Sequence, residues 1–198
     1  MLRTLAIAAV VSVSTGAVAG GPLFDAVSAG DTAGIERLLS TGAPIDGRDR
    51  DRATPLIIAA LNAQPGAAQV LLSKGADVMA RNSAGFTPLH AAAYSGSVPV
   101  ARLLLGKGAV LEDAANRAGA TPLTVAAEEN RTAMVEFLIE KGADVSRPEN
   151  HGYTPLTRAF WRSHKDTVRV LMRHGATCQS ADVLGSEALR GECLEIRD

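Results

Sequence analysis

Few side chains in this 198-residue sequence have the type and spacing that catalysis or metal binding requires. The four histidines show no paired spacing typical of metal ligands, and no Cys-His zinc pattern occurs. The Gly-x-Ser-x-Gly, Walker A and Gly-x-Gly-x-x-Gly patterns are also missing. We therefore predict a protein that is not an enzyme and has no metal ion or cofactor. The histidines are His90, His151, His164 and His174.

The two cysteines are the remaining reactive side chains. Cys178 and Cys193 lie 15 residues apart near the C-terminus. In an oxidising compartment an isolated pair of this kind is expected to form a disulfide. Closing a loop of this length stabilises a fold by about 3 kcal/mol in the chain-entropy estimate. The alternative is a pair of free or buried thiols.

The net charge bears on which classes of partner the protein could bind, and the composition bears on its core. The formal net charge is −1 and the isoelectric point is near 6.4, so electrostatics give no reason to expect nucleic acid or an acidic membrane surface. Aromatic residues make up only 4% of the chain, which suits a core of Leu, Val and Ala.

The first 19 residues differ from the rest of the chain. Arg3 is followed by an apolar stretch over residues 5–13 and by the cleavage pattern Ala17-Val18-Ala19. This order is typical of a secretory signal peptide. The apolar run is shorter than the roughly 20 residues of a membrane span, although an uncleaved anchor is the alternative. We expect cleavage near Ala19, a bacterial periplasmic or secreted protein, and no membrane insertion after cleavage.

One short motif returns along the whole chain. Thr-Pro-Leu begins at Thr54, Thr87, Thr121 and Thr154, at intervals of 33, 34 and 33 residues. A Gly-Ala pair follows each Thr by 21 residues, and the same count from Gly42-Ala43 leads back to Gly21-Pro22-Leu23. Five repeats of this length indicate stacked units rather than one closed globule.

Each repeat predicts two helices. Thr is a good N-cap and Pro is favoured at the first helical position, so a short first helix begins at each Thr-Pro. A second helix follows with apolar residues at helical spacing, and it stops at the Gly, a residue suited to a left-handed C-cap. The remaining dozen residues form a connection that ends in a turn before the next Thr.

The hexapeptide Thr87-Pro88-Leu89-His90-Ala91-Ala92 and its period resemble the ankyrin repeat over about residues 21–178. The resemblance implies an all-α ankyrin-repeat solenoid of about five helix pairs, with projecting β-hairpin loops. It also implies that His90 is a structural histidine and not a ligand. The repeats would lie within residues 20–178, at about 21–49, 50–82, 83–116, 117–149 and 150–178. Residues 179–198 would form a C-terminal cap with a half-repeat helix from Ser186 to Glu195.

Three positions depart from the repeat. Arg52 stands where other connections have Gly85, Gly119 or Gly152, so it is either strained by about 1 kcal/mol at positive φ or lies in a different turn. The third connection is one residue longer, which predicts a bulged or lengthened hairpin around Glu112 to Arg117. Arg158 occupies a column that is apolar in the three preceding repeats.

The resemblance further implies that another protein binds on a concave face formed by hairpin tips and first helices. Contact positions of the family lie just before Thr-Pro and at the end of the first helix. Their aromatic members are of types enriched in binding hot spots, although they could instead pack within the stack. On this sequence the contact positions are Arg50, Asp51, Ala53, Leu61, Asn62, Ser83, Phe86, Tyr94, Ser95, Arg117, Glu128, Glu129, Asn150, His151, Tyr153, Trp161 and Arg162.

Several functions fit such a surface. The chain is similar to periplasmic ankyrin partners of oxidative-stress enzymes such as catalases, and to immunity proteins that block toxins. The sequence does not choose between these partners. A passive or self-associating structural protein of the envelope is the alternative. An enzyme accessory with its own cofactor is disfavoured by the missing ligand pattern.

Overall fold

A computed structural model of the chain describes residues 21–196, and all regular secondary structure in this range is helical. The predicted signal peptide, residues 1–19, lies outside the described residues. The chain divides into two compact units between Val110 and Leu111, which we call unit 1 and unit 2 and describe separately.

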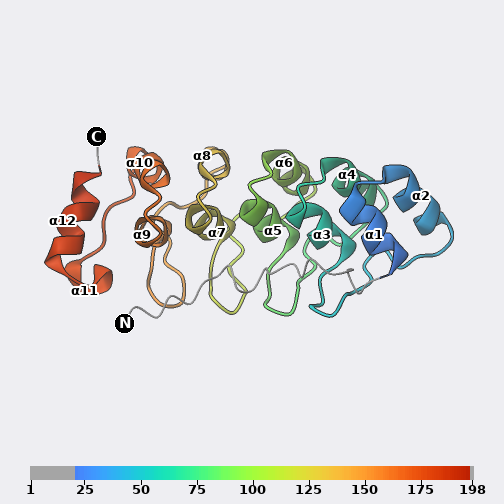
Figure 1. Cartoon of the computed structure of the whole chain (residues 1–198), viewed down its shortest axis with the longest axis horizontal. Helices are drawn as coiled ribbons and strands as arrows, with labels where there is room; N and C mark the ends of the chain where they lie inside the picture. Colours follow the sequence, from blue (N-terminus) through green and yellow to red (C-terminus); the bar gives the residue numbers. More distant parts are fainter. Residues whose placement is uncertain (1–20, 197–198) are drawn as a thin grey trace. The chain divides into compact units, whose positions relative to one another are not determined.

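From residue 21 onward, unit 1 contains three helix pairs. The first helices pack side by side, α1 on α3 and α3 on α5, and the second helices do the same, α2 on α4 and α4 on α6 (Figure 1). Their bounds are α1 Pro22–Ala29, α2 Thr32–Ser40, α3 Pro55–Leu61, α4 Pro65–Ser73, α5 Pro88–Ser95 and α6 Val98–Gly106.

Unit 2 contains two further pairs and the C-terminal cap. Here α7 packs on α9 and α8 on α10, while the two cap helices pack on each other. The bounds are α7 Pro122–Glu128, α8 Thr132–Glu140, α9 Pro155–Trp161, α10 Lys165–Arg173, α11 Ala181–Leu184 and α12 Glu187–Glu195. The predicted fold class, an all-α solenoid of helix pairs, is confirmed.

The helix ends follow the predicted chemistry. Thr54, Thr121 and Thr154 each accept a hydrogen bond on the side-chain oxygen from the amide three residues later, at 3.2 to 3.4 Å. Pro occupies the first helical position after each of them. At the other end, the Gly that follows each second helix has φ between 89° and 95°. In these three repeats the Thr cap marks the start of the helix pair and the Gly marks its end.

The core repeats with the sequence. Each side chain of the Leu column that follows Pro is at most 4% exposed. The Ala column three residues further is fully buried from the second repeat onward. The small Ala side chains let neighbouring first helices approach closely. Leu carries the apolar area and Ala sets the spacing. The columns are Leu23, Leu56, Leu89, Leu123 and Leu156, and Ala59, Ala92, Ala126 and Ala159.

The connections before the first helices project as fingers, and we call residues 49–53, 82–86, 116–120 and 149–153 the finger tips (Figure 1). Three tips are closed by a backbone hydrogen bond from the first N–H to the fifth C=O, at 3.0 to 3.1 Å. In all four, the first side chain accepts from the amides two and four residues later. No residue between 21 and 196 lies in a β-strand, so the fingers are hairpin-shaped turns without strands.

The extra residue of the third connection lies before its finger tip. Asn116 follows Gly108 by 8 residues, whereas Asn82 follows Gly75 by 7. The Asn116 tip keeps both of its side-chain bonds, to the amides of Ala118 at 3.2 Å and Ala120 at 3.1 Å. The connection is therefore lengthened between Gly108 and Asn116, and the tip itself is not bulged.

The cap contains the predicted helix and one more. The Ser186 hydroxyl oxygen accepts from the Leu189 amide at 3.1 Å, and α12 begins at the next residue after Ser186. The short helix α11 was not predicted. Cys178 and Cys193 are joined in a disulfide, as the spacing indicated.

Candidate functional site

Glu149 is the centre of a polar cluster in unit 2. Its carboxylate accepts from the His151 amide at 3.0 Å and lies 2.8 Å from His151 Nδ1. Arg158 Nη2, from α9, lies 3.2 Å from the other carboxylate oxygen. The side chains of Glu149 and Arg158 are 0% and 7% exposed. Glu149 therefore joins a finger tip to the first helix that follows it.

Three rings lie in a row beside this ion pair. The His151 and Tyr153 rings are stacked, with centroids 6.1 Å apart, and the Tyr153 and Trp161 rings meet edge to face at 4.5 Å. The Arg158 guanidinium lies 5.2 Å from the Tyr153 centroid, within cation–π range. His151 is exposed, and Tyr153 and Trp161 are half-buried. We call His151, Tyr153 and Trp161 the ring row.

A second ion pair links the ends of α7 and α9. Arg162 Nη2 lies 2.8 Å from Glu128 Oε1, with side-chain exposures of 32% and 2%. The His164 Nε2–H donates to the Glu128 carbonyl at 3.0 Å. Among the described residues, the buried atoms Glu128 Oε2 and Trp161 Nε1 have no hydrogen-bond partner. Buried polar atoms of this kind raise the free energy of the folded protein.

Glu129 adds a second carboxylate at the end of α7. Its pKa is raised, chiefly because burial disfavours the charged form and secondly because Glu128 is negative. Arg162, Arg131 and His164 oppose this shift with their positive charge. Two adjacent carboxylates thus share one arginine at this edge of the surface.

In unit 1 the region of the two finger tips is held together by hydrogen bonds to backbone carbonyls. The Ser83 amide donates to the Asp51 carbonyl at 2.8 Å. The Arg48 guanidinium donates to the carbonyls of Arg52 at 2.9 Å and Arg81 at 2.6 Å. These bonds leave the side chains of Arg50, Asp51 and Ser83 exposed.

The ends of α3 and α5 hold the other predicted contact residues of unit 1. Leu61, Asn62 and Tyr94 are half-buried, and the Ser95 hydroxyl donates to the Ala60 carbonyl at 2.7 Å. In unit 2, Arg117 and Asn150 are exposed, and Asn150 Nδ2 donates to the Arg117 carbonyl at 3.2 Å.

Some predicted contact residues face inward. Phe86 is 3% exposed and its ring centroid lies 5.2 Å from that of His90, so it packs within the stack. Ala53, at the same position of its finger tip, is 4% exposed. Glu128 is 3% exposed and is satisfied in part by Arg162. These three do not offer a side chain to the surface, and the role of the exposed residues stays a prediction.

The structure brings some predicted residues together and adds two that were missed. It joins Glu128 to Arg162, and it aligns the ring row. Glu149 and Arg158 were not among the predicted contact residues, yet they fix this arrangement. Two patterns could have indicated them. Arg158 interrupts an apolar column, and the first finger-tip residue is an acid or an amide in every repeat, at Asp49, Asn82, Asn116 and Glu149.

Within residues 21–196, no group of three or more His, Cys, Asp or Glu side chains is placed to hold a metal ion. None of the described helices is long and apolar enough to cross a membrane. His90 has a structural role, because its Nδ1 accepts from the Thr87 amide at 3.3 Å and lies 2.9 Å from the Thr87 hydroxyl.

Comparison with known proteins agrees with this geometry. A family model of ankyrin repeats, which contains three copies of the repeat, matches residues 23–115 and again residues 108–182. Among curated proteins there is no match to the chain. Repeats of the matched family generally mediate protein–protein interaction and are typically non-catalytic. With the repeat period, the helix pairs and this match in agreement over most of its length, the chain belongs to the ankyrin repeat family.

Proposed function

We propose that this protein is a non-catalytic scaffold of the bacterial envelope that binds another protein with its finger tips and first-helix ends. The observation that carries the proposal is the ring row of unit 2. Tyr153 and Trp161 are in contact, partly exposed, and fixed by the Arg158–Glu149 ion pair. Tyr, Trp and Arg are the residue types that most often dominate binding energy.

The rigidity of this surface favours binding. Because His151, Tyr153 and Arg158 are already positioned by Glu149, few side chains lose conformational freedom when a partner docks. Arg162 is held in the same way by Glu128. Aromatic and arginine side chains that are already held in place can pack against the backbone or side chains of a partner.

The envelope location rests on two features. The first 19 residues have the sequence order of a signal peptide, and the Cys178–Cys193 disulfide suits an oxidising compartment. Within this proposal the partner is either a toxin that the scaffold neutralises or an oxidative-stress enzyme that it supports.

Affinity capture from the native envelope fraction with tagged residues 20–198 tests the proposal. Wild type should retain a distinct protein, and Trp161→Ala should lose it while circular dichroism stays unchanged. A matched pair of arginines sharpens the test. Arg162→Ala, on the proposed surface, should weaken capture, and Arg169→Ala, on α10 in an exposed ion pair with Asp166, should not.

Each outcome bears on one model. Equal capture by Trp161→Ala and wild type would remove the ring row from the binding surface. Retention of nothing but further copies of this chain would support the self-associating structural alternative. The double variant Tyr94→Ala/Trp161→Ala adds the predicted aromatic contact of unit 1, and a larger loss than with Trp161→Ala alone would show that both units contribute.

A further inference from the structure

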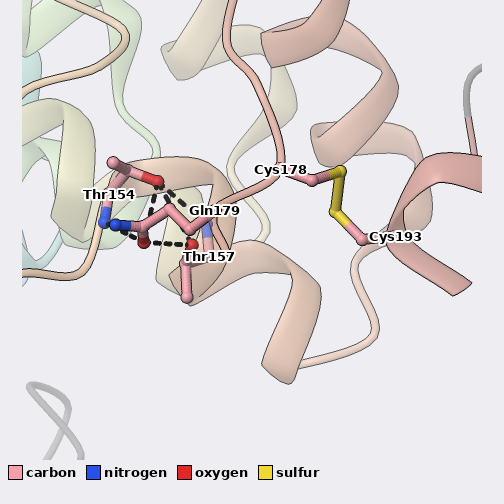
Figure 2. Close-up of a disulfide and its surroundings, with 5 residues drawn as sticks. All are labelled: Thr154, Thr157, Cys178, Gln179 and Cys193. Atoms are coloured by element: carbon pink, nitrogen blue, oxygen red, sulfur yellow. Dashed lines mark hydrogen bonds between the residues drawn. A yellow bond between two sulfur atoms is a disulfide. The ribbon is translucent and has the colours of Figure 1, made fainter. Parts of the chain in front are cut away.

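The C-terminal cap is attached to the last repeat by few apolar contacts. Between residues 181 and 196 only Leu184 and Cys193 are fully buried, at 1% and 0% exposure. The cap helices α11 and α12 pack on each other more closely than on α9 or α10. The disulfide between Cys178 and Cys193 is therefore a principal attachment of α12 to the rest of unit 2 (Figure 2).

The residue next to Cys178 completes the start of α9. Gln179 Oε1 accepts from the Thr154 amide at 3.1 Å and from the Thr157 hydroxyl at 2.5 Å. Gln179 Nε2 donates to the Gly152 carbonyl at 2.8 Å. Gly152 belongs to the finger tip 149–153, so one side chain joins the disulfide segment to the tip that carries His151 and Tyr153.

We propose that the Cys178–Cys193 disulfide is an exchange site for a dithiol reductant, and that its reduction releases the cap and loosens the finger tip 149–153. The supporting geometry is a continuous path of bonds. The disulfide joins Cys193 to Cys178, the peptide chain joins Cys178 to Gln179, and a hydrogen bond joins Gln179 to Gly152. The consequence for binding rests on the proposed function, but the loosening itself does not.

The exchange balances with the dithiol as the only co-reactant. Its thiolate attacks Cys178 Sγ, because Cys178 is half-buried whereas Cys193 is fully buried. The Cys178–Cys193 bond breaks, a mixed disulfide forms at Cys178, and Cys193 leaves as a thiolate that takes a proton. The second thiolate of the reductant then attacks the mixed disulfide. The products are the oxidised reductant and two protein thiols, so two electrons and two protons are transferred.

Release of the cap should be local. Without the cross-link the α12 segment regains the freedom of a 15-residue loop, so its opening equilibrium rises on the order of 100-fold in the chain-entropy estimate. The segment that carries Gln179 then moves with Cys178, and the bonds to Thr154 and Gly152 are lost for part of the time. The hydrogen bonds described for Gln179 go to Gly152, Thr154 and Thr157 of unit 2, so the amides of unit 1 should not respond.

Hydrogen exchange on the full chain, oxidised and after dithiothreitol, tests the proposal. Reduction should accelerate exchange in α12 on the order of 100-fold and in residues 149–157 at least several-fold. Amides of α3 and α5 should keep their rates. Trp161, the only tryptophan, should change its fluorescence because it contacts Tyr153. Cys178→Ser/Cys193→Ser in oxidising buffer should match the reduced wild type.

Gln179→Ala separates the two steps. In the oxidised variant residues 149–157 should exchange faster while α12 stays protected, and reduction should add little at the tip. The proposal is overturned if reduction leaves α12 unchanged, if α12 loosens while the tip does not, or if unit 1 unfolds along with the cap. None of these readouts involves a partner, so this inference can fail while the binding proposal stands, and the reverse.

Discussion

Arg158 Nη2 lies 3.2 Å from Glu149 Oε1, and both side chains are removed from water, at 7% and 0% exposure. The pair joins α9 to the finger tip that precedes it. At the position of Arg158 the preceding repeats have the buried apolar residues Ile58, Ala91 and Val125. The desolvation of two charges offsets much of their attraction. We therefore interpret the pair as holding the ring row in place rather than as adding to stability.

Removing one partner of this pair should be costly. Arg158→Val, which restores the residue type of the column, leaves the Glu149 carboxylate buried without its guanidinium, and we expect a loss of about 3 kcal/mol. Urea denaturation followed by circular dichroism measures it. Adding Glu149→Gln to Arg158→Val should recover a large part of the loss.

The control for this prediction is Arg169→Val. Arg169 and Asp166 form an exposed ion pair on α10, whose removal should cost at most about 1 kcal/mol. A loss at Arg158 no larger than at Arg169 would mean that water or another group neutralises Glu149.

Arg52 adopts the backbone conformation that its glycine counterparts favour. Its φ is 58°, its amide donates to the Asp49 carbonyl at 3.0 Å, and Gly85 makes the same bond to Asn82 at 3.0 Å with φ of 90°. The turn is therefore shared and Arg52 is strained. Arg52→Gly should raise the free energy of unfolding by about 1 kcal/mol, because relief of strain exceeds the entropic disadvantage of glycine.

Arg50→Gly is the matched control for Arg52→Gly. Arg50 is exposed in the same finger tip, but it is not among the described residues with positive φ. This variant should be neutral or slightly destabilising in thermal unfolding. Equal effects of the two substitutions would contradict the strain argument.

His90 should be important for stability rather than for binding. It is 1% exposed and satisfies the Thr87 amide at 3.3 Å. His90→Ala leaves that amide buried without this acceptor and opens a cavity against Phe86, so we expect a loss of about 2 kcal/mol. Thermal unfolding measures the loss, and partner capture at a temperature where the variant is folded should be unchanged.

His90→Thr provides the conservative comparison. The fourth repeat has Thr124 at this position, with its hydroxyl 3.0 Å from that of Thr121. His90→Thr should therefore be more stable than His90→Ala. Equal stability of the two variants, or the reverse order, would show that a hydroxyl at this position does not replace the hydrogen bond of His90.

Glu129 should make stability depend on pH in the direction opposite to most carboxylates. Its folded-state pKa is raised by burial and by Glu128, whereas a glutamate in an unfolded chain has a pKa of about 4.3. Between the two pKa values the folded protein binds more protons than the unfolded chain, so this contribution to stability falls as pH rises. Glu129→Gln should therefore stabilise the protein at pH 7 and lose its advantage at pH near 4.

Urea denaturation at the two pH values measures this difference. Glu140→Gln, which removes an exposed carboxylate at the end of α8, is the control for the loss of one negative charge. If Glu129→Gln were neutral at both pH values, Glu129 would be better solvated than its position indicates.

The repeat architecture could be predicted from the sequence because its determinants are local. Thr at the N-cap, Pro at the first helical position and Gly at positive φ act within a few residues. The period then indicates that the same helix pair recurs along the chain. The disulfide was also predictable, since only two cysteines are present. The helix Ser186 to Glu195 followed from the continuation of the Leu column.

Only the tertiary structure decided which side chains of the surface meet. The pairing of Arg158 with Glu149 depends on how a finger tip folds back onto the helix that follows it. The pairing of Arg162 with Glu128, across 34 residues, depends on how the first helices α7 and α9 stack on one another. Phe86 and Tyr153 occupy the same position of their finger tips, yet Phe86 is buried against His90 and Tyr153 is half-exposed beside Trp161. Local periodicity fixes where a helix begins and ends, but the burial and ion pairing of a surface side chain depend on which neighbours the fold brings to it, and the repeat period does not specify these neighbours.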